Sequence, residues 1–221
     1  MQPDCLRLFP LDVVLFPGTS LPLHIFEPRY RKMLADCLSS DRRFGLVHLS
    51  SELSELESGT VGCVAEIMES QELPDGRSNI VVHGGDRFVF VTLVESDEPY
   101  AVGRVREYAD DLEFGGELDA LAERVRDLFE VVARAARTLA DDTDTIPELP
   151  REPSLLSFAI ASAIELDISL RQELLASRSP TARLRQLDQL LSPAVPGLVT
   201  RADVHKRAKH NGKGTHTQPN P

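Results

Sequence analysis

The sequence predicts an α+β protein, in which a small antiparallel β-barrel or sandwich with one capping helix is followed by an α-helical bundle. Short apolar runs separated by turn residues fill the chain up to about residue 110, and one helical pattern interrupts them. After Gly115 and Gly116 the apolar spacing becomes helical. With 221 residues, 42% of them hydrophobic, the chain allows one large domain or two small ones.

The expected strands are apolar runs bounded by proline, glycine or charged residues. Pro17-Gly18 and Pro74-Asp75-Gly76 are turn signals, because proline fixes one φ angle and glycine accepts a positive one. The runs are Leu6–Phe9, Val13–Phe16, Leu21–Phe26, Phe44–Leu49, Val61–Glu69, Asn79–His83, Phe88–Val94 and Val102–Tyr108. Their short, regular spacing favours antiparallel pairing.

One helix is expected between these runs. Pro28 suits a first helical turn. Apolar residues then recur at helical spacing, at Tyr30, Met33, Leu34, Cys37 and Leu38. We expect this helix to cover the open end of the barrel, where an uncovered edge would invite aggregation.

A long helix is expected after the two glycines. Its apolar stripe consists of Leu118, Leu121, Val125, Leu128, Val132, Ala136 and Leu139. Prolines at 147, 150 and 153 interrupt the pattern. Three shorter helices are expected around Ser154–Leu166, Ser169–Ala176 and Pro180–Leu191. An apolar stripe needs a packing partner, so these helices should form a bundle.

The last segment, residues 193–221, is expected to be a disordered basic tail. Pro193, Pro196 and Gly197 should end the last helix, and few large apolar side chains follow. From residue 201 onward five lysines and arginines face one aspartate, which leaves −15 for the first 200 residues of a chain with net charge −11. The first 200 residues are acidic enough to repel a phosphate backbone, so we do not expect nucleic acid as a partner.

Several kinds of chemistry have no motif in the sequence. The only Gly-Lys pair, Gly212-Lys213, lacks the phosphate-loop pattern, and three scattered cysteines indicate neither a zinc site nor a disulfide scaffold. We therefore expect no catalytic residue, no cofactor and no metal. The chain has no apolar run long enough to span a bilayer and no signal-like start, so a cytoplasmic protein without membrane contact is expected.

One enzymatic alternative stays open. A nucleophile could consist of Cys63 or Cys37 with one of three histidines, His24, His48 or His83. Both cysteines fall in apolar patterns, however, where thiols are usually buried and unreactive. A Cys/His-dependent hydrolase is therefore the less favoured interpretation.

The opening of the chain resembles a known family. Leu8-Phe9-Pro10-Leu11, Val14-Leu15-Phe16-Pro17-Gly18 and the run from Leu21 to Tyr30 are similar to the start of the Lon N-terminal domain. This domain is the substrate-recognition module of the ATP-dependent protease Lon, and it also occurs as a free-standing bacterial protein. Further matches are Phe44–Val47, Gly59–Gly62, Pro74–Arg77, Gly85–Phe88, Arg171–Leu175 and Arg183-Leu184.

The resemblance covers about residues 4–192. It implies a PUA-like β-barrel over 4–110 and a helical bundle over 116–192 as two parts of one Lon N-terminal domain, in agreement with the apolar patterns. The ATPase and Ser-Lys protease regions of Lon have no counterpart here, so the resemblance implies no enzymatic activity. RNA binding is a further alternative, since PUA-like barrels occur in RNA-modifying proteins.

The motif residues are also the candidate binding surface. They are Phe16, Pro17, Gly18, Pro22, Phe26, Glu27, Pro28, Arg29, Tyr30 and Arg87. We expect Phe26 to plug the barrel, and Glu27 and Arg29 to pair with charges across it, Arg87 among them. Tyr30 should lie at the edge of an apolar groove that accepts an unfolded segment.

The function expected from the resemblance is non-enzymatic binding of unfolded or degron-bearing polypeptides. The protein would act as an adaptor or regulator in protein quality control or proteolysis, in contact with a protease or a chaperone. The long helix could pair with a second copy or within its own chain, which leaves a monomer or a weak homodimer open.

Overall fold

The computed structural model describes residues 4–49, 53–143 and 148–211. They form one six-stranded mixed sheet and five α-helices, so the protein belongs to the α+β class. The strands are β1 (Asp4–Leu11), β2 (Ser20–Ile25), β3 (Arg43–His48), β4 (Val61–Glu72), β5 (Ser78–Val94) and β6 (Ala101–Glu107). A short 3-10 helix, η1 (Leu53–Glu55), precedes β4.

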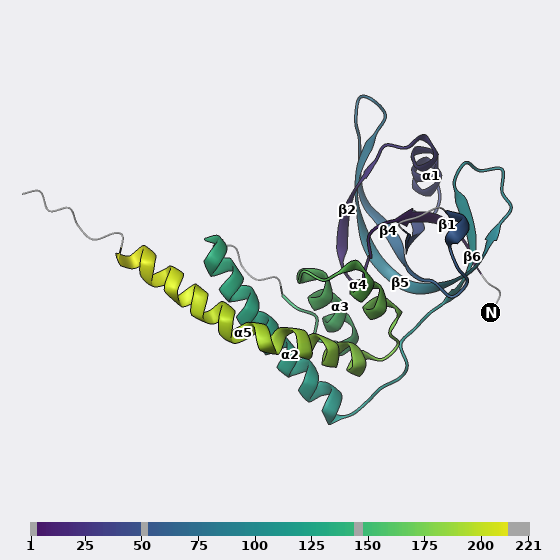
Figure 1. Ribbon diagram of the computed structural model, residues 1–221. Coiled ribbons are helices and arrows are strands. Elements are labelled where there is room, and N and C mark those ends of the chain that lie inside the picture. Colours follow the sequence, from purple (N-terminus) through teal and green to yellow (C-terminus); the bar gives the residue numbers. More distant parts are fainter. Residues whose placement is uncertain (1–3, 50–52, 144–147, 212–221) are drawn as a thin grey trace, which may run out of the picture.

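The sheet has the order β2-β5-β4-β3-β1-β6, and β5 also pairs with β6. The pairings of five strands therefore close into a ring, while β2 stays outside it as an edge strand. In Figure 1 β2 borders the sheet on the left, and no helix runs alongside it. Within the described residues its only strand partner is β5.

One pairing contradicts the antiparallel prediction. β1 and β3 run parallel, with Leu8 opposite Gly45, whereas the other pairs are antiparallel. The chain between β1 and β3 contains β2 and α1 (Pro28–Leu38), which is long enough for the crossover that parallel neighbours require.

Two expected strand boundaries were also wrong. Val13–Phe16 is not a strand but a buried irregular segment that leads into the Pro17-Gly18 turn. The two runs 79–83 and 88–94 form one strand, β5, which passes through Gly84 and Gly85 without interruption. Gly84 is required there, because a Cβ atom would overlap the carbonyl oxygen of Phe16.

The helix between β2 and β3 is confirmed. α1 begins at Pro28, as the sequence predicts, and buries Tyr30, Met33, Leu34 and Cys37. The Tyr30 ring lies 4.2 Å from the Phe9 ring between centroids, which fastens the helix to the sheet.

Four helices follow the sheet: α2 (Gly116–Ala140), α3 (Pro153–Ala163), α4 (Ile168–Ala176) and α5 (Pro180–Asn211). The predicted stripe of α2 is confirmed in part: Leu118 and Val125 are buried, and Leu121, Leu128 and Val132 are partly buried against the core. Ala136 is exposed, and the buried face instead includes Ala122, Phe129 and Ala135. α2 and α5 run parallel, because Glu117 pairs with Arg185 near their starts and Asp141 hydrogen-bonds His205 near their ends. Figure 1 shows these two helices side by side, extending away from the sheet.

The predicted end of the last helix was wrong. α5 continues through Pro193 and Pro196 to Asn211, so residues 193–211 are helical rather than disordered. Ala202 is buried, and Asp141 at the end of α2 bonds His205 of α5. Packing on α2 thus overrides the local proline signal. The remaining residues of the predicted tail, 212–221, lie outside the described residues.

The sheet and the helices share the larger of two hydrophobic clusters, while the smaller one, which includes Phe88 and Phe90, contains only residues of the strand-rich half. Buried residues from β1 to α5 belong to a single cluster, and the ring of Phe16 stacks on that of Phe158 in α3 at 5.7 Å. No helix in the described ranges is both long and apolar enough to cross a membrane.

Candidate functional site

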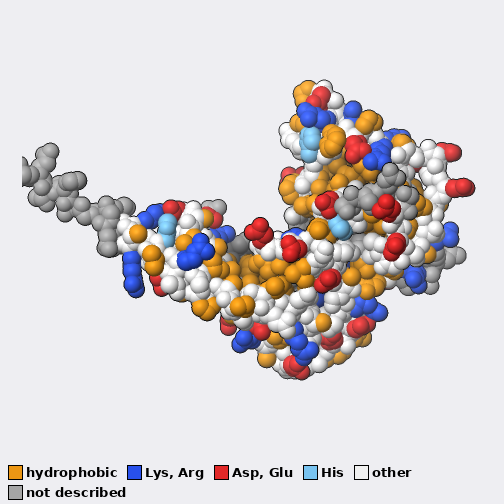
Figure 2. Space-filling model, in the orientation of Figure 1, with side chains coloured by type: hydrophobic (Ala, Val, Ile, Leu, Met, Phe, Trp, Pro, Cys, Tyr) orange, Lys and Arg blue, Asp and Glu red, His pale blue; other side chains and the backbone are white. Residues whose placement is uncertain are grey.

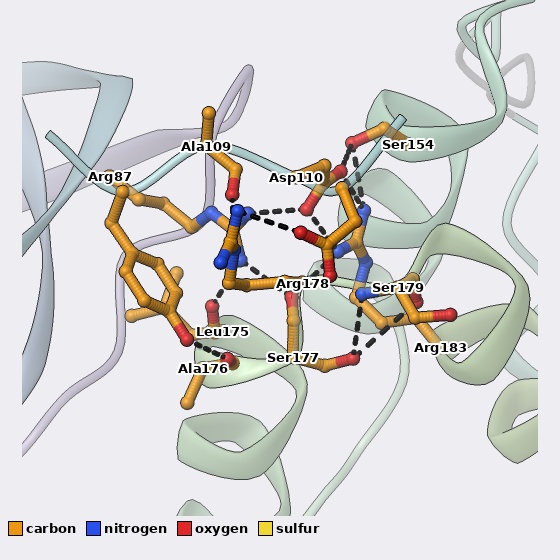
Figure 3. A network of polar contacts seen from close by, with 12 residues as sticks. Arg87, Ala109, Asp110, Ser154, Leu175, Ala176, Ser177, Arg178, Ser179 and Arg183 are labelled. Carbon is orange, nitrogen blue, oxygen red and sulfur yellow. Dashed lines mark hydrogen bonds and ion pairs between the residues drawn. The ribbon is translucent and has the colours of Figure 1, made fainter. Parts of the chain in front are cut away.

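Arg87 lies at the junction of the sheet and the helices, where Figure 3 shows it in a polar network. Its Nη1 donates to the carbonyl oxygens of Leu175 at 2.6 Å and Ser177 at 2.7 Å, and its Nη2 donates to Asp110. The expectation that Glu27 and Arg29 pair with Arg87 is therefore wrong. Arg87 connects β5 to the end of α4.

A second arginine completes this network. Arg183 of α5 forms two parallel hydrogen bonds to Asp110, each 2.7 Å long, and also donates to Ser154 and Ser157 of α3. Its guanidinium lies 4.1 Å from the Phe158 ring centroid. We call Arg87, Asp110 and Arg183 the junction network; it joins the sheet, the β6–α2 linker and three helices.

The junction network places two positive side chains against the one carboxylate of Asp110. The side chain of Arg183 is completely buried, and that of Arg87 is 3% exposed. Burial alone would raise the pKa of Asp110, but hydrogen bonds from Arg183 and Ser154 and the two positive charges outweigh it and lower the pKa. Burial lowers the pKa of Arg87.

The junction network has a structural role, because the guanidinium groups of Arg87 and Arg183 already have hydrogen-bond partners within the protein. Arg87 is among the site residues predicted from the sequence, whereas Asp110 and Arg183 are not. Arg183 stood in a matched motif, yet nothing in the spacing of residues 87, 110 and 183 shows that they meet.

The other nine predicted site residues lie in β2 or in the segments directly before and after it. Phe16, Pro17 and Gly18 precede the strand, Pro22 lies within it, and residues 26–30 follow it. The predicted turn is confirmed: Gly18 has φ 74°, and the amide of Thr19 donates to the carbonyl of Phe16 at 3.3 Å. Phe16 itself is fully buried.

The predicted role of Phe26 is wrong. Its side chain does not plug the sheet but is 59% exposed, and its ring stacks on His24 at 6.1 Å. Glu27 and Arg29 pair with each other, at 2.9 Å, rather than with charges across the sheet. Tyr30 is only 5% exposed, so it belongs to the core and not to the edge of a groove.

A hollow of about 630 Å³ lies between α1 and the end of the β4–β5 hairpin. We call it the α1 hollow. Leu34, Ala35 and Leu38 provide its apolar wall, and two basic side chains and one acidic side chain line it as well: Arg31, Arg42 and Glu72. Arg42 donates to the carbonyl of Ile67 at 2.9 and 3.0 Å, which holds this guanidinium in place.

Arg31 differs from Arg42. Its guanidinium has no hydrogen bond or ion pair to any part of the chain that the structure describes. It lies against Gly76 of the hairpin turn, where a Cβ atom would overlap its Nη2. The α1 hollow thus combines an apolar wall with a guanidinium that can accept an anionic partner.

A second hollow, of about 410 Å³, lies across β2, β5 and β4, and we call it the β2 hollow. It is lined by Pro22 and His24 of β2, and it shares Ser70 with the α1 hollow. Nδ1 of His24 is 2.7 Å from Oδ1 of Asn79, which orients the imidazole.

Exposed apolar side chains border both hollows. Phe26 stacks on His24 of the β2 hollow, and Met68, 60% exposed, follows directly on Ile67, whose carbonyl binds Arg42. Leu38, 36% exposed, lines the α1 hollow. Figure 2 shows hydrophobic, basic and histidine side chains next to one another at the end of the sheet that α1 covers.

The two buried thiols bond to the backbone. Sγ of Cys63 is 3.4 Å from the carbonyl oxygen of Gly85, and Sγ of Cys37 is 3.2 Å from that of Arg43; among the described residues, neither thiol has a hydrogen bond to an imidazole. Burial raises the pKa of Cys37 to about 11 and that of Cys63 further. No group of three metal-binding side chains occurs in residues 4–49, 53–143 and 148–211.

The family model for the ATP-dependent protease La (LON) substrate-binding domain matches residues 5–192. The chain therefore belongs to this family, and the resemblance noted from its opening motif is confirmed. It is 29% identical over 202 residues to Lon protease of Solibacter usitatus and 30% identical over 189 residues to Lon protease 2 of Herpetosiphon aurantiacus. These alignments cover 90% and 84% of this chain but 25% and 23% of the relatives, so the chain spans about a quarter of their length.

Solved structures show the same fold. The N-terminal domain of Mycobacterium avium complex Lon protease superposes with a TM-score of 0.66 at 19% identity, covering 86% of this chain and 98% of that one. A Lon N-terminal domain protein from Xanthomonas campestris gives 0.58 at 24% identity, covering 83% and 96%. The match extends through both the sheet and the helices.

Proposed function

We propose that the protein binds unfolded or degron-bearing polypeptides without catalysing a reaction on them. The observation that carries this proposal is the α1 hollow, where an apolar wall and the unpaired Arg31 lie beside exposed Leu38. An extended chain could place an apolar side chain in the hollow and a carboxylate on Arg31. The family match supports the proposal, because its description names substrate binding.

The mode of binding follows from Pro22. Pro22 lies in the edge strand β2. Proline is tolerated in an edge strand where its nitrogen faces away from the paired strand, and on that open side its ring blocks pairing with an additional strand. We therefore propose that clients are held by side chains in the two hollows and by Phe26, and not by extension of the sheet through β2.

The proposal includes an architecture and a cellular role. The closed ring of strands over 4–110 would be a PUA-like barrel, and the helices over 116–192 a second part of the same domain. The protein would present clients to a protease or a chaperone, or regulate Lon by competing for its substrates. Neither the hydrolase nor the RNA-binding alternative gains support from the site geometry.

The test is a titration of a permanently unfolded, fluorescein-labelled polypeptide, followed by anisotropy. Leu38→Ser should weaken binding by about tenfold or more, because burying a leucine contributes about 1.5–3 kcal/mol. Leu190→Ser is the matched control, since Leu190 is also on a helix and is 38% exposed, against 36% for Leu38. Absence of binding at tens of micromolar, or equal losses in both variants, would reject the proposal.

A further inference from the structure

Two prolines divide α5 into two parts. Pro193 and Pro196 have no N–H, so each leaves one carbonyl oxygen of the preceding turn without its helical donor. Gly197 follows directly, and glycine favours a helix interior least after proline. We call residues 193–197 the hinge segment and residues 198–211 the distal part of α5.

The part of α5 before the hinge segment is attached firmly. Its side chains at Leu184, Leu187 and Leu191 are buried in the larger hydrophobic cluster. Arg124 of α2 donates to the carboxylate of Asp188 at 2.7 Å. Apolar burial and an ion pair thus hold this part of the helix on the rest of the molecule.

The distal part of α5 has a much smaller apolar contact. In the described chain, no residue after Leu191 belongs to either hydrophobic cluster. Ala202 is buried, but it contributes only a methyl group, and Val199 and Val204 are largely exposed. Apolar burial therefore holds the distal part on α2 only weakly.

Asp141 at the end of α2 supplies a polar attachment instead. Its φ angle of 57° is one that residues other than glycine, asparagine and aspartate rarely adopt. Oδ1 of Asp141 is 2.8 Å from Nε2 of His205 and also pairs with Nζ of Lys209. Hydrogen bonds from Lys209 and His205 lower the pKa of Asp141. One carboxylate thus binds two side chains of α5 that lie one helical turn apart.

We propose that the distal part of α5 is a movable strap, which turns at the hinge segment and is clasped onto α2 by Asp141. The side chains of Asp141, His205 and Lys209 are all partly exposed, so water readily replaces their contacts. Opening uncovers Ala135 and Ala202 but leaves both hydrophobic clusters intact. Figure 1 shows the strap at the end of the helices farthest from the sheet, and thus apart from the α1 hollow and the proposed client.

The decisive experiment measures the distance between spin labels on α2 and on the strap by double electron–electron resonance. The labels are attached through Ala136→Cys and Ala208→Cys, two exposed positions, in a Cys5→Ser background whose other thiols are buried. With the clasp intact, one short distance should dominate. Asp141→Asn keeps a residue that tolerates the positive φ but removes the charge. It should raise the ratio of open to closed molecules about fivefold.

Two further variants separate the clasp from the hinge. Glu130→Gln is the matched control, because Glu130 is a similarly exposed carboxylate of α2 that pairs with Arg134 of the same helix, and it should leave the distances unchanged. Adding Pro193→Ala and Pro196→Ala to Asp141→Asn should restore the single short distance, because an uninterrupted helix resists bending there. Circular dichroism will verify that each variant folds.

Four results would overturn the inference. They are a mostly open strap with the clasp intact, unchanged distances in Asp141→Asn, an equal effect of Glu130→Gln, and open molecules that persist after both prolines are replaced. Because the labels report only on α2 and α5, a failure here leaves the proposed polypeptide binding untouched, and a failure of that binding leaves the strap untouched.

Discussion

Asp110 carries a single negative charge between two arginine side chains that are 3% and 0% exposed. Each guanidinium also donates to carbonyl or hydroxyl groups. Asp110 supplies the negative charge that offsets the positive charge of these two buried side chains. Removing one partner from such a group is costly because the remaining charge cannot regain its water.

Asp110→Ala should therefore lower the free energy of unfolding by about 3–5 kcal/mol. Its neighbour provides the control: Asp111 pairs with Arg178, but these side chains are 59% and 48% exposed. Asp111→Ala should cost only about 0–1 kcal/mol. Urea denaturation followed by circular dichroism measures both, and similar losses would contradict a special role for Asp110.

The lowered pKa of Asp110 predicts a pH dependence. Because the native pKa lies below the unfolded value of about 3.9, the ionised carboxylate stabilises the fold above that pH, and the contribution is lost as the pH falls through the native pKa. The stability difference between wild type and Asp110→Asn should be largest near neutral pH and shrink below about pH 4. A difference that stays constant down to pH 2 would contradict the assignment.

The three cysteines should differ sharply in reactivity. Cys5 is exposed, whereas Cys37 and Cys63 are buried and burial raises the pKa of both thiols. In the native protein at pH 8 a thiol reagent should label one equivalent rapidly and two only after unfolding. Cys5→Ser removes the rapid phase. Rapid labelling that persists in this variant would instead support Cys37 or Cys63 as a reactive nucleophile.

At the scale of single residues, the sequence predicted local backbone conformation better than the exposure and the contacts of side chains. The Pro17-Gly18 turn follows from local φ preferences and was predictable. The exposure of Phe26 was not, because a phenylalanine at the end of an apolar strand run is usually buried. Arg87 and Arg183 meet through tertiary structure alone.

Among the elements, α5 departs most from local rules. Pro193 and Pro196 each remove an intrahelical hydrogen bond, yet the helix continues to Asn211. The last part of α5 packs on the last part of α2, where Ala135 and Ala202 are buried and Asp141 holds His205. The long stripe of α2 was visible in the sequence, but its partner was not, because single-segment patterns do not show pairing.

Truncation after Ser192 tests this mutual support. Without residues 193–211, the C-terminal turns of α2 lose their packing surface and the bonds of Asp141. Hydrogen exchange of amides in residues 133–140 should accelerate about tenfold or more, because short unsupported helix ends open readily. Amides of β4 are the internal control and should keep their protection. Unchanged exchange at residues 133–140 would show that α2 needs no support from α5.

In the molecule as a whole, the sheet and the helices depend on one another. The period of the apolar pattern predicted both halves correctly, since strand-like runs end and helical spacing begins near residue 115. It could not show the parallel β1–β3 pair or the common core, which come from contacts between distant residues. Phe16 stacks on Phe158, and Arg87 binds carbonyls at the end of α4.

The shared core predicts a single cooperative unfolding transition. Calorimetry should give one peak whose calorimetric and van't Hoff enthalpies agree, although the chain has a strand-rich and a helix-rich half. A fragment of residues 1–110 should lack cooperative unfolding, because it would expose Phe16, leave the Arg87 guanidinium without the carbonyls at the end of α4, and leave Asp110 without Arg183. Extending the fragment to residue 211 restores these contacts. Two calorimetric peaks, or a fragment that melts cooperatively, would show instead that the sheet is an independent domain with its own sufficient core.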